Sequence, residues 1–120
     1  MTRFALLLTS STFSSQSLAS VLVFANAVIS SGHSIDHIFL YQDAVYSVAA
    51  NIDLPADEPD LAANLVQFCQ QHQIDLLFCV TAAEKRGIIS ADQPAKAGFT
   101  AAGLAEFAVR QASIDKLVQF

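Results

Sequence analysis

Cys79 is the side chain of this sequence with the clearest capacity for chemistry. It lies in the apolar run of residues 74–80 (IDLLFCV), which predicts a buried strand, and residues 81–87 (TAAEKRG) follow as the start of a helix. Proteins with α/β folds place reactive groups at the carboxyl ends of strands. The positive end of the next helix favours a thiolate, the nucleophilic form of cysteine. The position predicts a nucleophile; the alternative is a small apolar residue packed at a strand end.

The second cysteine has a different setting. Cys69 shares the apolar stripe of a predicted helix with Leu61, Leu65 and Phe68, so we expect a structural thiol there. Two cysteines form neither a disulfide scaffold nor an all-thiolate zinc site. The histidines that a mixed site would need are scattered, at His33, His37 and His72. We therefore expect no metal site.

His37 and the two tyrosines invite a catalytic role, but their positions favour packing. His37 alternates with apolar residues in the predicted strand 35–41, which predicts a core or interface group rather than a general base. Tyr41 and Tyr46 follow at the end of that strand, where we expect packing or interface contacts. His33, next to Gly32, is expected at the surface beside a helix end.

The predicted elements alternate along the chain. Apolar runs predict strands over residues 4–8, 35–41, 74–80 and 114–120, and helical spacing predicts helices over 14–31, 43–50, 61–72, 81–86 and 104–111. Residues 88–98 read mostly as loop, and prolines and acidic residues around 53–60 mark an exposed loop. Alternating strands and helices predict an α/β fold. We expect a single domain over residues 1–120, a three-layer parallel sheet flanked by helices and flavodoxin-like in outline.

Composition narrows the function classes. Only 14% of the 120 residues are charged and 53% are hydrophobic, whereas charged residues usually make up about a quarter. This balance favours a subunit that hides an apolar face in an oligomer over a well-packed domain with a hydroxyl-rich surface. The net charge of -5 disfavours direct binding to nucleic acid, which requires clustered Lys and Arg.

Cellular location follows from the first thirty residues and from the thiols. The apolar stretch at residues 4–8 is interrupted by polar residues 9–17, so we expect no signal peptide. No apolar run is long enough to span a membrane. Reduced thiols fit a cytoplasmic protein.

The loop of residues 9–16 follows the first strand and opens a helix, which is where phosphate sites form. It has hydroxyl groups but no glycine, and phosphate-binding loops depend on glycine for close backbone approach. We expect an ordinary capping loop that borders the Cys79 pocket.

Three internal segments and the chain end carry a family resemblance. They are residues 39–46 (FLYQDAVY), 78–87 (FCVTAAEKRG), 99–104 (FTAAGL) and 118–120 (VQF). In this order they resemble the DsrE-like sulfur carriers, over nearly the whole chain. Ala44 and Ala105 stand where that family commonly has glycine.

The resemblance implies a sulfurtransferase whose persulfide is carried at Cys79, with no cofactor. It implies a dimer of heterotrimers with TusB- and TusC-like sister subunits, a TusA-like sulfur donor and a TusE-like acceptor. The implied pathway ends in 2-thiolation of the wobble uridine of tRNA. The alternatives are a subunit of a sulfur-oxidation system and a non-catalytic, partner-binding subunit with a buried Cys79. A flavodoxin-like binder of a nucleotide or flavin is disfavoured by the absence of a glycine-rich loop.

Lys85 and Arg86 follow Cys79 within one or two helical turns. If they lie at the mouth of its pocket, their charges favour the thiolate. The alternative is an ordinary solvated helix end.

Overall fold

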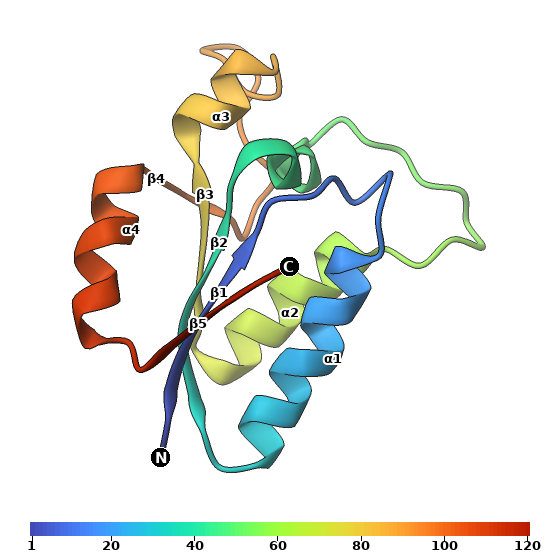
Figure 1. The fold of residues 1–120 in the computed structure, drawn as a ribbon. Helices are drawn as coiled ribbons and strands as arrows, with labels where there is room; N and C mark the ends of the chain where they lie inside the picture. The colour runs from blue at the N-terminus through green and yellow to red at the C-terminus, as the bar shows by residue number, and fades with distance from the viewer.

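A computed structural model describes all 120 residues. Figure 1 shows a sheet whose strands run through the middle of the molecule, with helices on both faces. The strands are β1 (Arg3–Leu8), β2 (Ser34–Leu40), β3 (Asp75–Cys79), β4 (Thr100–Ala102) and β5 (Lys116–Gln119). The helices are α1 (Ser17–Ser30), α2 (Leu61–His72), α3 (Val80–Lys85) and α4 (Leu104–Arg110), with short 3-10 helices η1 (Gln42–Val48) and η2 (Gln111–Ser113). None has the length and apolar content that a bilayer crossing requires.

The five strands form one parallel sheet in the order β4-β3-β2-β1-β5. Helices α1 and α2 cover one face and α4 lies on the other (Figure 1). The predicted three-layer α/β fold is therefore confirmed. Central strands buried on both faces explain the apolar runs in the sequence, because neither face meets water.

The two long helices follow the expected patterns. In α1 the residues Leu18, Val21, Ala25 and Val28 are buried at helical spacing and face the sheet. Asp60 caps the amino end of α2, and its carboxylate accepts a hydrogen bond from the Ala63 N–H at 3.0 Å.

Three local predictions need correction. Strand β4 was not expected, because Thr-Ala-Ala is only three residues long and two of them are alanine, which is depleted in strands. The expected helix at 43–50 is the 3-10 helix η1. The predicted strand 74–80 ends at Cys79, so α3 begins at Val80, one residue early, and Cys79 is its N-cap.

Gln73 caps the carboxyl end of α2 and has a left-handed backbone with φ of 56°. Glycine takes this conformation without steric cost, so Gln73→Gly should raise the free energy of unfolding by about 0.5–1 kcal/mol in urea denaturation. The exposed Gln71 within the same helix is the matched control, and Gln71→Gly should lower it by about 1 kcal/mol. Equal effects of the two variants would contradict the left-handed assignment.

Candidate active site

Cys79 lies at the carboxyl end of β3, as the sequence predicts. It is only 3% exposed, but it lines a surface pocket of about 400 Å³. The pocket is formed by the following residues: Tyr41, Gln42, Cys79, Thr81, Ala82, Lys85, Arg86 and Leu104. We call it the Cys79 pocket. It gives the sulfur a route to the surface that a core residue lacks.

The register of the sheet builds the first wall of the Cys79 pocket. Strands β2 and β3 are parallel, with Leu40 opposite Phe78. The segments that follow them therefore leave the sheet side by side, at the carboxyl ends of the strands. Gln42 then takes a left-handed backbone with φ of 51°. Beyond this turn η1 packs against α3, which keeps the loop after β2 next to the thiol.

Lys85 and Arg86 both line the Cys79 pocket, which is the first of the two placements that the sequence left open. The Arg86 guanidinium is held by Asp43, with Nε donating to Oδ1 at 2.9 Å, and by the Ala82 carbonyl at 3.1 Å. Lys85 is exposed and forms no ion pair. None of the residues lining the pocket is acidic. In a chain of net charge -5 this is a locally cationic site.

Sequence reasoning did not single out Gln42 and Leu104 as site residues. Both lie in segments that carry the family resemblance, and these segments converge in space. Every residue that lines the Cys79 pocket comes from segments 39–46, 78–87 and 99–104. The resemblance was thus a signal that could have identified both residues.

Cys69 is a core residue, as expected. It is 2% exposed on the inner side of α2, and burial raises the pKa of its thiol to about 12. Both cysteines are free. Cys69 therefore stays protonated at neutral pH and is a poor nucleophile.

His37 is a core group rather than a base. It is fully buried beneath α4, with Nδ1 2.8 Å from Asp36 Oδ2 and its ring edge-to-face with Phe107. Burial alone would raise the pKa of Asp36, but hydrogen bonds from His37 and Arg3 lower it overall. No group of three or more potential ligands is placed to hold a metal ion.

The loop of residues 9–16 does not border the Cys79 pocket, which corrects that prediction. Thr12 and Phe13 line a separate pocket with Asp53, Glu58 and Asp60. These carboxylates repel a phosphate group, which argues against a nucleotide or flavin phosphate at this loop.

Comparison with known proteins gives consistent results. A family model of the DsrE/DsrF-like family matches residues 2–120. The curated protein "Sulfurtransferase TusD" of Erwinia tasmaniensis is 37% identical over 128 residues, covering 98% of this chain and 99% of that protein.

Solved structures show the same fold. The ychN protein from E. coli has a TM-score of 0.81 at 23% identity, with both chains fully covered. A protein of unknown function from Methanobacterium thermoautotrophicum has a TM-score of 0.66 at 12% identity, again with full coverage of both chains.

The buried thiol of Cys69 makes stability depend on pH. Above the ordinary pKa of 9.0 the unfolded chain loses this proton, whereas the native thiol keeps it up to about 12. The free energy of unfolding should therefore fall between these values, with a slope approaching about 1.4 kcal/mol per pH unit from this group. Urea denaturation from pH 7 to 11 should show a shallower fall in Cys69→Ala. The Cys79→Ala control keeps Cys69 and should retain its contribution; identical slopes in wild type and Cys69→Ala would contradict the assignment.

Proposed function

Because the chain belongs to the DsrE/DsrF-like family, we propose that it is a sulfur-transferring subunit that carries sulfur as a persulfide on Cys79. The observation that carries the proposal is the Cys79 pocket. Three segments, far apart in the sequence, supply all its lining residues, and they are the segments of the family resemblance. The 37% identity to a protein named as a sulfurtransferase supports the same role.

The reaction is an exchange between two sulfur atoms. The Cys79 thiolate attacks the outer sulfur of a donor persulfide, a new S–S bond forms, and the donor leaves as a thiolate. An acceptor thiolate then attacks the outer sulfur on Cys79, and the Cys79 thiolate leaves. The electrons balance in each step, so the exchange needs no redox cofactor. A proton released by the Cys79 thiol is taken up by the departing donor thiolate or by solvent.

Lys85 and Arg86 support this chemistry by their charge. Both the thiolate and the terminal sulfur of a persulfide are anionic at neutral pH, and cations near the pocket stabilise them. Asp43 offsets part of the Arg86 charge. Lys85 has no acidic partner, so we assign it the larger electrostatic effect.

The partners follow from the same proposal. A TusA-like protein delivers the sulfur, TusB- and TusC-like subunits form the complex, and a TusE-like protein accepts the sulfur for 2-thiolation of the tRNA wobble uridine. The exposed apolar side chains of Leu104, Val109 and Leu117 support association with other subunits, because they are 48%, 75% and 47% exposed. They lie on α4 and β5, and Leu104 also lines the Cys79 pocket.

A second candidate function is a non-catalytic, partner-binding subunit. The observation that favours it is the 3% exposure of Cys79, since a thiol in the core does not react. The pocket beside the sulfur favours the catalytic role, and the reactivity of Cys79 separates the two.

Persulfide loading tests the proposed function directly. Incubation of the protein with glutathione persulfide should add the mass of one sulfur atom to the peptide that holds Cys79. The adduct should be absent in Cys79→Ser and retained in Cys69→Ala, because the buried Cys69 thiol stays protonated. Intact-protein and peptide mass spectrometry measure both. An unloaded Cys79 in the assembled complex would overturn the proposal in favour of the partner-binding subunit.

Alkylation with reagents of different charge tests the role of Lys85. Iodoacetate is an anion and iodoacetamide is neutral, so the ratio of their rates at Cys79 reports the local potential. Lys85→Gln should lower the iodoacetate-to-iodoacetamide ratio about threefold to fivefold at low ionic strength. Lys116→Gln is the matched control. Lys116 lies opposite Phe4 of β1 in the edge strand β5, away from β3, so its loss should leave the ratio unchanged. An unchanged ratio in Lys85→Gln would show that Lys85 is an ordinary solvated residue at a helix end and does not stabilise the Cys79 thiolate.

A further inference from the structure

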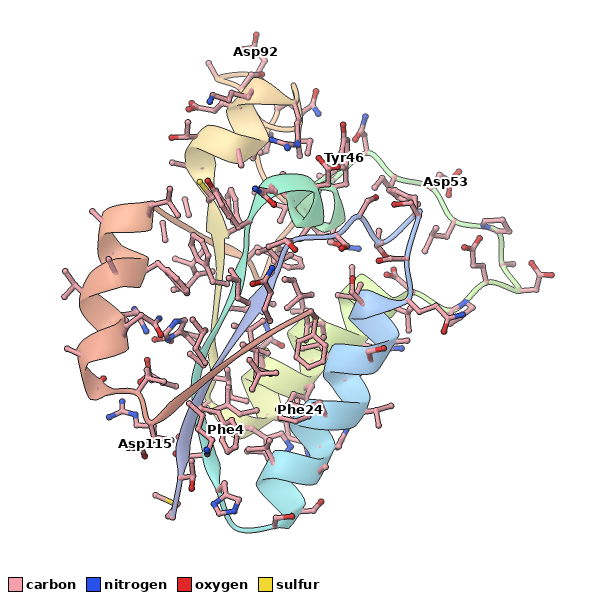
Figure 2. All side chains as sticks on the ribbon, in the orientation of Figure 1. Phe4, Phe24, Tyr46, Asp53, Asp92 and Asp115 are labelled. Carbon is pink, nitrogen blue, oxygen red and sulfur yellow. The ribbon has the colours of Figure 1, made fainter.

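A second pocket lies on the α1 and α2 side of the sheet, between the loop after β1 and the loop that joins η1 to α2. Figure 1 shows these two loops extending on the same side of the molecule, and Figure 2 labels Asp53 on the second one. We call it the acidic pocket. It has a volume of about 470 Å³, within the range of small-molecule sites. It shares no lining residue with the Cys79 pocket.

The charge of the acidic pocket is unbalanced. Asp53, Glu58 and Asp60 line it, together with Lys96 as the only cation. Lys96 Nζ lies 3.6 Å from Asp60 Oδ2, and Asp60 also caps α2. Asp53 and Glu58 have no cationic partner in the chain. Two uncompensated carboxylates attract a cation and repel an anion.

Ser47 provides an independent observation that points to a ligand. This residue of η1 lines the acidic pocket and is only 4% exposed. Its hydroxyl takes part in none of the side-chain hydrogen bonds of the structure. No fully buried side-chain polar atom lacks a partner, so the Ser47 oxygen is not fully buried. The Ser47 oxygen therefore keeps access to the pocket. A hydroxyl that is open only toward a pocket takes its hydrogen-bond partner from whatever fills that pocket, and a ligand N–H would supply one.

The remaining walls are apolar. Phe13, Ile52 and Leu54 line the acidic pocket, and Phe13 is 59% exposed. We infer that the acidic pocket binds an organic cation, an ammonium group on a short aliphatic stem. The ammonium donates to Ser47 and pairs with Asp53 or Glu58, while the stem packs on the apolar wall. This site is separate from the proposed sulfur chemistry and does not depend on it.

Titration of the full-length, isotope-labelled protein with pentylammonium tests the inference. Amide NMR shifts should be saturable and should concentrate at Ala49, Ile52 and Leu61 around the pocket. The isosteric neutral alcohol, pentanol, should bind at least threefold more weakly, and hexanoate should not bind. Equal binding of pentylammonium and pentanol, or shifts that never saturate, would overturn the cation site.

Variants test where the cation binds, and a second ligand tests whether the natural ammonium group belongs to a protein or to a free amine. Glu58→Gln and Ser47→Ala should each weaken pentylammonium binding about threefold or more. Asp57→Asn is the matched control on the same loop, because Asp57 does not line the pocket, and it should not weaken binding. Equal effects of Glu58→Gln and Asp57→Asn would overturn the site. The second ligand is Nα-acetyl-lysine methylamide, which mimics a lysine residue within a protein. If it binds more tightly than pentylammonium, the natural ligand is a lysine side chain of a protein partner. If it binds more weakly, the natural ligand is a free amine.

Discussion

The parallel pairing of β2 with β3 is the interaction on which the candidate active site depends. With Leu40 opposite Phe78, the chain leaves β2 at Tyr41 and leaves β3 at Cys79, side by side at the carboxyl ends of the two strands. A shift of register by one residue would turn the side chains of one strand to the other face. The Cys79 sulfur would then lose its pocket while the apolar character of the strand stayed the same.

Helix α4 completes the site from the second face of the sheet, where Figure 1 shows it across the sheet from α1 and α2. Its carboxyl end is held by polar contacts: Arg110 pairs with Asp75 at 3.0 Å and with Asp36 at 3.4 Å. Its amino end places Leu104 at the Cys79 pocket. Helix α4 has no fully buried residue. It is oriented by these ion pairs together with Phe107, whose ring stacks on Phe39 with the centroids 4.8 Å apart, and its amino end lines the Cys79 pocket.

The sequence predicted the features that depend on local pattern. Continuous apolar runs marked the central strands because both faces of a parallel sheet are covered, and the strand-to-helix junction located Cys79. Strand β4 was not predicted because it has only three residues and two of them are alanine, so Thr100 alone favours a strand there. The left-handed turn at Gln42 was also unpredictable, since glutamine does not mark that conformation. The acidic pocket joins residues from loops that are distant in the sequence, and no local sequence pattern predicts such a pocket.

The two cysteines also constrain how a sulfur would leave the protein. A carrier with a second reactive thiol can discharge its persulfide by forming an internal disulfide. Burial raises the pKa of Cys69 to about 12, so Cys69 remains a neutral thiol and does not attack. A persulfide on Cys79, as proposed, would therefore have no exit within the chain, and its sulfur would be taken by the thiolate of another molecule that reaches the pocket. A protonated, buried Cys69 beside a Cys79 that lines an open pocket would thus favour relay between proteins over sulfur release within this one.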